Sequence, residues 1–286
     1  MGPFLCRKTS ALRQFKAIRD GAGFEKTKLS LSRKSFIVKH GANPSFFSYY
    51  FHTELIITVL MKKIYIFGAG GFAKEVYFLI HDINKEKAVY EIGGFLDVNP
   101  ATHKIQIGKN EFDVFDETAF FAKEVSVDTC FAVGIGNPKI LKKIHDKYFP
   151  KFDFPNLIHP RTIGLFESIE MGKGNIVTAG CIFTIDTKLG SCNIFNLHST
   201  IGHDSVIGSC NVISPGSNLS GKLTMGDGNL IGANATVLEN LTIHDHSVIG
   251  AGSVVRNDVE SNQTVIGNPA VDVVKFGKLR NFINKL

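Results

Sequence analysis

The chain has 286 residues, of which 44% are hydrophobic and 20% charged, a composition typical of a folded protein with room for two domains. The net charge of +6 comes from the start of the chain, because residues 1–60 hold ten basic and three acidic residues and the remainder holds 22 and 23. The near-neutral remainder gives no indication of a nucleic-acid partner, and the most apolar run, 55–61, is too short to span a membrane.

Residues 1–60 show no sustained periodicity and contain scattered aromatic residues and loop formers. Met61, followed by two lysines and a buried-strand pattern, resembles a translation start. We therefore expect residues 1–60 to be an extension outside the functional fold. A transit peptide is the alternative that their basic character allows, although they contain no clear cleavage pattern.

The next segment, 61–158, alternates strand and helix patterns. Apolar runs predict strands at 63–67, at 129–133 and ending at 94–97, and apolar faces predict helices at 73–83 and 139–148. This alternation is typical of a parallel sheet, whose ligands bind at the carboxyl ends of the strands.

A glycine turn follows the first of these strands. Gly68-x-Gly70-x-x-Ala73 fits the dinucleotide-binding fingerprint, with Asp97 as the candidate ribose-binding acid. The segment is shorter than a complete dinucleotide fold, so we interpret it as a half-Rossmann domain that binds a nucleotide or sugar head group. The alternative is a tight turn without a ligand.

From Leu165 to Val255 an apolar residue recurs at every sixth position, sixteen times in succession. Neither helical nor strand periodicity explains this spacing, whereas a hexapeptide period is typical of a parallel β-helix over 159–260, followed by a tail at 261–286. Residues 18 apart should then stack about 4.8 Å apart on adjacent coils. Glycine directly follows several of the apolar residues, as in Ile201-Gly202 and Ile249-Gly250, and we expect it to supply turn conformations. A β-sandwich with coincidental spacing is the alternative.

Five cysteines follow no metal-binding spacing. Cys192 and Cys210 are 18 residues apart and should stack on adjacent coils. The odd count, without a convincing secretory signal, favours reduced thiols and a cytoplasmic location.

His203 stands two positions after an apolar residue of the repeat, where a side chain should leave the β-helix. One coil later the stacked position is Gly221, which has no side chain to block the imidazole. An exposed histidine beside Asp204 suits a general base that takes a proton from a nucleophile. A surface histidine without a role is the alternative.

At these residues the chain resembles a known family. Met61 to Ala270 is similar to the hexapeptide-repeat sugar acetyltransferases, which include NeuD-like sialic acid O-acetyltransferases and PglD-like nucleotide-amino-sugar N-acetyltransferases. The resemblance depends on the segments 66–71, 95–97, 134–137, 202–208, 249–255 and 267–270.

The resemblance implies a left-handed β-helix, a homotrimer, and acetyl-CoA bound between coils of adjacent subunits, with no metal. His203 would be the base, assisted by Asp204. The positions that match the family's acetyl-CoA contacts are Gly221, Ala233 and Ala251. Those that match its acceptor contacts are Gly70, Gly71, Phe72, Asp97, Val98, Gly136 and, close to the base, Asn196. Relatives that use UDP-sugars often have histidine in place of Phe72 and a second acid in place of Val98. The resemblance therefore also allows a different nucleotide sugar, or a sialic acid, as the acceptor.

The sequence thus predicts direct acetyl transfer from acetyl-CoA to an amino or hydroxyl group of a sugar. We expect a nucleotide-linked amino sugar in surface-glycan biosynthesis, with sialic acid O-acetylation as the alternative. A zinc enzyme like the β-helix carbonic anhydrases is a more distant alternative, because His198 and His203 have the H-x₄-H spacing, although Thr162 stands where a third histidine is needed. A non-enzymatic trimeric scaffold is the other.

Overall fold

The structure is a computed structural model that describes residues 61–274. These residues all belong to one compact unit of the chain. The expectations for residues 1–60, and for the end of the tail, lie outside these residues. No helix within 61–274 is long and apolar enough to cross a membrane.

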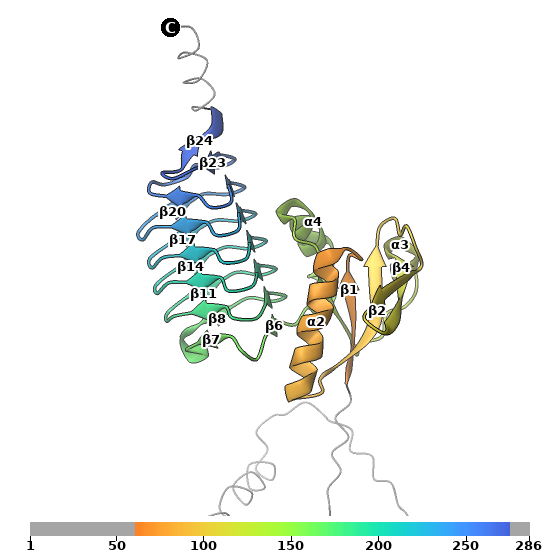
Figure 1. Ribbon diagram of the computed structural model, residues 1–286. Helices are drawn as coiled ribbons and strands as arrows, with labels where there is room; N and C mark the ends of the chain where they lie inside the picture. Colours follow the sequence, from red (N-terminus) through yellow and green to blue (C-terminus); the bar gives the residue numbers. More distant parts are fainter. Residues whose placement is uncertain (1–60, 275–286) are drawn as a thin grey trace, which may run out of the picture. The chain divides into compact units, whose positions relative to one another are not determined.

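The first part of the described chain is a sheet with the strand order β3-β4-β2-β1-β5 (Figure 1). Neighbouring strands are parallel except β3 and β4, which are antiparallel. The strands are β1 (Lys62–Phe67), β2 (Tyr90–Asp97), β3 (Lys104–Ile107), β4 (Asn110–Asp116) and β5 (Thr129–Val133). The helices are α2 (Gly71–Glu86), α3 (Glu117–Phe121) and α4 (Pro138–Tyr148). The predicted strands and helices are confirmed, with bounds that differ by a few residues.

The hairpin of β3 and β4 and the short helix α3 were not predicted. Their residues alternate charged and apolar side chains and lie at the edge of the sheet, so they lack the continuous apolar runs of β1 and β5. The hairpin turns at Gly108, whose φ of +60° is in the left-handed region, with Ile107 paired to Asn110. A Gly-x pair between two alternating segments was the signal for this hairpin.

The second part is wound as a left-handed β-helix of three sheets, whose strands pair in parallel except for the last strand, β24. We name each sheet by the strand that it contributes to one coil. The β12 sheet holds β6 (Leu157–Ile158), β9 (Ile176–Val177), β12 (Ile194–Phe195), β15 (Val212–Ile213), β18 (Leu230–Ile231), β21 (Val248–Ile249), β23 (Thr264–Ile266) and β24 (Val271–Asp272). The β13 sheet holds β7 (Ile163–Gly164), β10 (Ile182–Phe183), β13 (Thr200–Ile201), β16 (Asn218–Leu219), β19 (Thr236–Val237) and β22 (Val254–Val255). The β14 sheet holds β8 (Glu170–Met171), β11 (Lys188–Leu189), β14 (Val206–Ile207), β17 (Thr224–Met225) and β20 (Thr242–Ile243).

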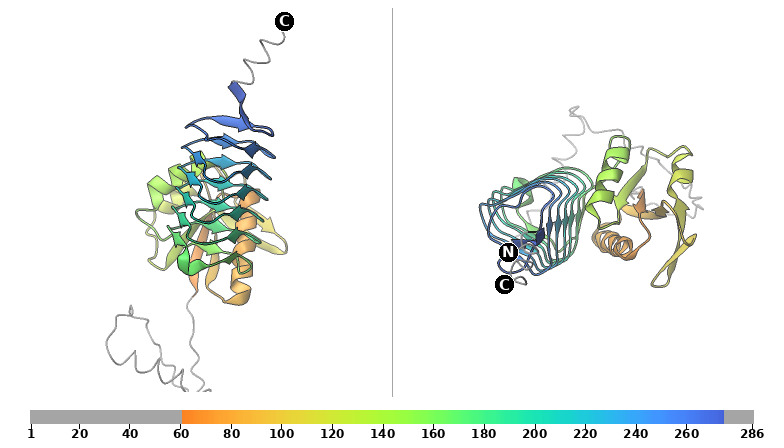
Figure 2. Two further views of the ribbon diagram at one scale, coloured as in Figure 1. Left: turned by 90° about the vertical axis from the view of Figure 1, so that its left-hand side faces the viewer. Right: turned by 90° about the horizontal axis from the view of Figure 1, so that it is seen from above.

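The coils stack with the predicted register, and seen end-on they superpose (Figure 2). Residues 18 apart pair in parallel, as Thr200 does with Asn218. The apolar residues of the repeat from Val177 to Val255 are buried. Leu165 differs from the expectation and is 44% exposed, because the 3₁₀ helix η1 (Phe166–Ser168) interrupts the first coil.

The small and amide-bearing side chains four positions after the apolar residues, such as Ser199 and Asn211, are buried. Asn175, Asn193, Asn211 and Asn229 form a column in which each side-chain oxygen accepts a hydrogen bond from the backbone N–H one coil above. The column continues to Ser247 and satisfies backbone donors that the turns leave unpaired inside the β-helix.

The expected role of the repeat glycines was wrong. Gly202 follows an apolar residue of the repeat but has no left-handed φ. A Cβ there would clash with the backbone nitrogen of Gly221 in the next coil. The left-handed residue is instead the third after the apolar position, as at Asp204, Cys210 and Lys222. Glycine after the apolar residue therefore permits close stacking of coils, and the turn itself tolerates other residues.

The β-helix extends past the expected boundary at residue 260. Strand β23 pairs in parallel with β21, Val248 opposite Thr264, and β24 then turns back antiparallel onto β23. Residues assigned to the tail therefore close the last coil.

The core of the α/β domain continues onto the β-helix. Leu141 of α4 belongs to the same buried cluster as Ile194, Cys192 and Cys210. The two cysteines stack as predicted: the neighbouring Cys210 thiol, together with burial, raises the pKa of the Cys192 thiol. The four cysteines in the described part of the chain are free thiols.

Candidate active site

The corner that follows β13 carries the predicted base. The side chain of His203 is exposed, and its Nδ1 lies 2.8 Å from Oδ2 of Asp204. Asp204 has a φ of +57°, the left-handed conformation that turns the chain at this corner. The turn of the β-helix thus brings the carboxylate beside the imidazole, as expected for an orienting residue.

This hydrogen bond assigns the protonation of the ring. A carboxylate only accepts hydrogen bonds, so Nδ1 carries the proton and donates it to Asp204. In the neutral form of the ring the lone pair is then on Nε2, which can accept a proton from a bound substrate.

Gly221 lies one coil above His203, as the 18-residue spacing predicts. The Lys222 N–H donates to the His203 carbonyl at 2.7 Å, which fixes the two coils at this corner. A Cβ at Gly221 would lie 2.7 Å from Nε2 of His203. The imidazole thus lies against bare backbone, and no larger residue fits there while the ring keeps this position.

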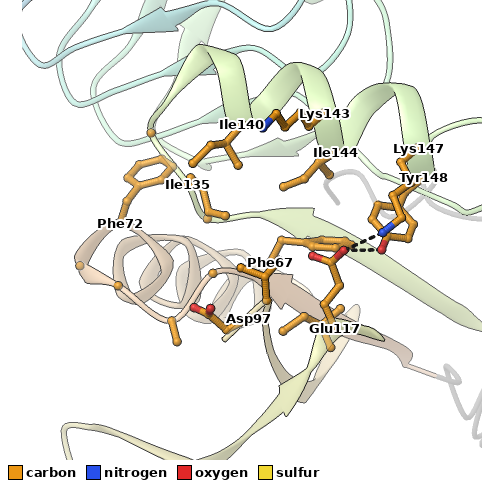
Figure 3. A pocket seen from close by; sticks show the side chains of 18 residues that line it. Phe67, Phe72, Asp97, Glu117, Ile135, Ile140, Lys143, Ile144, Lys147 and Tyr148 are labelled. Atoms are coloured by element: carbon orange, nitrogen blue, oxygen red, sulfur yellow. Dashed lines mark hydrogen bonds and ion pairs between the residues drawn. The ribbon is translucent and has the colours of Figure 1, made fainter. Parts of the chain in front are cut away.

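The α/β domain holds a cavity of about 620 Å³ at the carboxyl ends of its strands (Figure 3). Its lining includes every predicted acceptor-binding residue of that domain, namely Gly70, Gly71, Phe72, Asp97, Val98 and Gly136. The volume is in the range of small-molecule sites. His203 does not line this cavity.

The glycine turn has the geometry of a phosphate site. Gly68 has a φ of +91°, and a Cβ at Gly134 would lie 2.6 Å from Cα of Ala73, so α2 packs directly on the strand that precedes Gly134. Gly70 and Gly71 face open space. Helix α2 has no side-chain cap and no acidic residue in its first turn, so its first N–H groups point to the cavity end without a side-chain acceptor.

Glu117 also lines the cavity, and the sequence reasoning missed it. It is only 8% exposed, and its Oε1 accepts hydrogen bonds from Lys147 Nζ at 3.0 Å and from the Tyr148 hydroxyl. Glu117 begins α3, whose N-cap is Asp116, with Oδ1 accepting from the Ala119 N–H at 2.8 Å. An acidic N-cap followed by a second acid is a helix-start signal that could have located it.

Three predicted site residues lie away from His203 and Gly221 within one chain. Asn196, Ala233 and Ala251 follow strands of the β12 sheet, whereas His203 and Gly221 follow strands of the β13 sheet. Ala233 and Ala251 lie on adjacent coils, linked by the Gly252 N–H donating to the Ala233 carbonyl at 2.8 Å. Asn196 Oδ1 accepts from the Leu197 N–H at 2.7 Å and from the Thr178 hydroxyl of the adjacent coil at 3.4 Å. One chain therefore presents two separate corners rather than one complete site.

The two histidines of the zinc alternative occupy these different corners as well. His198 has a left-handed φ of +58° and packs against Gly180, at the opposite end of β13 from His203. Within residues 61–274 no group of three or more histidine, cysteine, aspartate or glutamate side chains is arranged to hold a metal ion.

Both parts of the chain match known families. Residues 63–148 match the PglD N-terminal domain, and residues 223–257 match the bacterial transferase hexapeptide (six repeats). No curated protein matches the chain closely enough to count as a relative.

Solved structures match over most of the chain. The acetyltransferase domain of PglB from Neisseria gonorrhoeae FA1090 is 28% identical, with 74% of this chain and 99% of that chain covered and a TM-score of 0.66, and it has also been solved with acetyl coenzyme A. PerB from Caulobacter crescentus, in complex with CoA and GDP-perosamine, is 26% identical over 73% of this chain and 96% of that chain, with a TM-score of 0.64.

The fold and these matches define the class of protein: the chain is an acetyltransferase, homologous to sugar N-acetyltransferases. More particularly, it combines a PglD N-terminal domain with a hexapeptide-repeat β-helix.

Proposed function

We propose that this acetyltransferase transfers acetyl from acetyl-CoA to the amino group of a nucleotide-linked amino sugar used for surface glycans. The observation that carries the proposal is the His203–Asp204 pair, whose free Nε2 lies against the bare backbone of Gly221. The matched PglB domain binds acetyl coenzyme A and PerB binds CoA and GDP-perosamine, which supports this pair of substrates.

In the proposed reaction, the amine nitrogen attacks the thioester carbon, and Nε2 of His203 takes the proton that the nitrogen loses. The C–S bond then breaks, CoA leaves as the thiolate, and the imidazolium returns the proton to it or to solvent. Asp204 holds the ring and stabilises the imidazolium. A backbone N–H that stabilises the oxyanion commonly contributes about 3 kcal/mol. No nucleophilic side chain is needed, so transfer is direct.

The binding roles divide between the two domains. The cavity of the α/β domain binds the nucleotide, with phosphate at the start of α2 and a ribose hydroxyl at Asp97. Gly221, Ala233 and Ala251 contact acetyl-CoA. Since these residues occupy two corners of one chain, the complete site forms between copies, and we propose a homotrimer in which Asn196 of one copy approaches His203 of another.

The test is an assay of acetyl transfer with UDP-, GDP- and dTDP-amino sugars, sialic acid and CMP-sialic acid. We expect turnover of a nucleotide amino sugar, and a decrease in kcat of roughly 10²–10⁴-fold in His203→Ala with the fold retained. His244→Ala, an exposed histidine after β20, is the matched control and should keep wild-type activity.

Near-native turnover by His203→Ala would remove this residue from the mechanism. Turnover of sialic acid, without turnover of any nucleotide amino sugar, would replace the proposed acceptor with the O-acetylated alternative. A stable acetyl-enzyme would contradict direct transfer.

A further inference from the structure

The carboxylate of Glu117 has an oxygen that no side chain of the described residues satisfies. Both of its hydrogen bonds, from Lys147 and Tyr148, reach Oε1, and within residues 61–274 none reaches Oε2. Figure 3 shows Oε2 directed away from these two donors. Because Glu117 lines the cavity, a bound ligand can supply an N–H or O–H to this carboxylate oxygen.

The surroundings keep Glu117 an acceptor. Lys147 supplies an ammonium group at 3.0 Å. Burial, and next the hydrogen bond to Glu117, raise the pKa of Tyr148, so its hydroxyl stays protonated and donates. With both donors committed to Oε1, the carboxylate has a fixed orientation. Oε2 is therefore a positioned acceptor rather than a mobile surface charge.

Much of the cavity wall is apolar. Phe67, Ile135 and Ile144 line it, and Phe67 packs on Tyr148 with ring centroids 5.0 Å apart. A planar ring fits between such side chains, with its polar edge toward the carboxylate. The glycine turn and Asp97 also line the cavity, so a nucleotide can place phosphate and ribose there and its base beside Glu117.

We propose that Glu117 selects the base of the nucleotide and that the acceptor is a guanosine-diphosphate-linked sugar. Guanine presents two adjacent donors, N1–H and the N2 amino group, to a carboxylate. Uracil and thymine present one N–H between two carbonyl oxygens, which the carboxylate repels. Adenine and cytosine present an amino group beside an unprotonated ring nitrogen. This inference rests on the proposed function, because it requires a nucleotide in the cavity.

The test is calorimetric binding of GDP, UDP, CDP and dTDP to the full chain and to Glu117→Gln. The wild type should bind GDP roughly tenfold or more tightly than UDP, as expected for hydrogen bonds to a charged group. In Glu117→Gln one amide oxygen still accepts from Lys147 and Tyr148, and the NH₂ group replaces Oε2. GDP affinity should then fall roughly tenfold or more, and UDP affinity should stay the same or rise. Glu124→Gln, exposed shortly after α3, is the charge-matched control and should leave both affinities unchanged.

Equal affinities of the wild type for GDP and UDP would overturn the base selection even if the variant does not fold. An equal loss for all four nucleotides in Glu117→Gln would also overturn it, because a purely structural role has that result. Absence of binding by any nucleotide would instead overturn the proposed acceptor class. The experiment thus distinguishes a failure of base selection by Glu117 from a failure of nucleotide binding itself.

Discussion

At the scale of single residues, the position of the candidate base His203 depends on Gly221, which has no side chain. A Cβ at Gly221 would lie 2.7 Å from Nε2 of His203, a distance that real contacts do not reach. In Gly221→Ala the imidazole must therefore move. We expect kcat to fall by roughly tenfold to 10²-fold, since a displacement near 1 Å is enough for such a loss.

The control for this variant is a double-mutant cycle. If Gly221→Ala acts through the imidazole, adding it to His203→Ala should cause no further decrease in kcat. Thermal unfolding of each variant separates displacement from misfolding. Additive losses in the double variant would contradict the displacement and indicate a different role for Gly221, such as its predicted contact with acetyl-CoA.

The same scale shows what the sequence could predict. His203 and Gly221 were predictable as neighbours because a constant register converts a spacing of 18 residues into a contact in space. The helix-start signal could place Glu117 at the start of α3 but could not predict its site, because its partners Lys147 and Tyr148 are 30 and 31 residues away on α4. No period relates these residues. The glycines that line the cavity were predictable in part. Their motif is local in the sequence, but the open space around Gly70 is visible only in the structure.

At the scale of elements, each corner of the β-helix requires one left-handed residue. The position is the third after the apolar residue and is occupied by Gly, Asn, Asp, His, Cys and Lys, so it has no single residue type for a sequence search. This is why the repeat itself was predictable and the true turn residue was not. Glycines were assigned to the turns, whereas several of them, such as Gly202, permit contact between coils.

Lys222, with a φ of +56°, tests this rule. Lys222→Val places a β-branched residue in the left-handed region, which should lower the free energy of unfolding by about 1–2 kcal/mol or more. Thr224→Val, at the exposed strand position two residues later, is the control and should change stability little. Thermal unfolding of the two variants measures the difference. Equal stabilities would show that this corner adopts another backbone conformation when the residue changes.

At the scale of the whole described chain, a partly buried polar pair joins the α/β domain to the β-helix. His159, only 5% exposed, follows β6, and its Nε2 lies 3.2 Å from Oδ2 of Asp82 on α2. Its Nδ1 accepts from the Arg161 N–H at 3.0 Å, so Nε2 carries the proton and donates to Asp82. No sequence pattern indicates this pair, because its members are 77 residues apart and belong to different periodic patterns.

The ionisation of Asp82, which is paired with Lys85 of the same helix and with His159, makes stability depend on pH. The hydrogen bond from Lys85 and, against the effect of burial, that from His159 lower the pKa of Asp82 to about 2 from an ordinary 3.8. A carboxyl group with a lowered pKa in the folded state contributes stability fully above pH 4 and loses it as the pH falls toward 2. Asp82→Asn should therefore lower the free energy of unfolding at pH 7 by about 2 kcal/mol, measured as a lower urea midpoint, and the difference from wild type should vanish near pH 2.

Asp146→Asn, which removes an exposed partner of Lys142 on α4, is the control and should lower the free energy of unfolding by at most about 1 kcal/mol. If the urea midpoints of wild type and Asp82→Asn differ equally at pH 7 and pH 3, ionisation of Asp82 does not stabilise the junction.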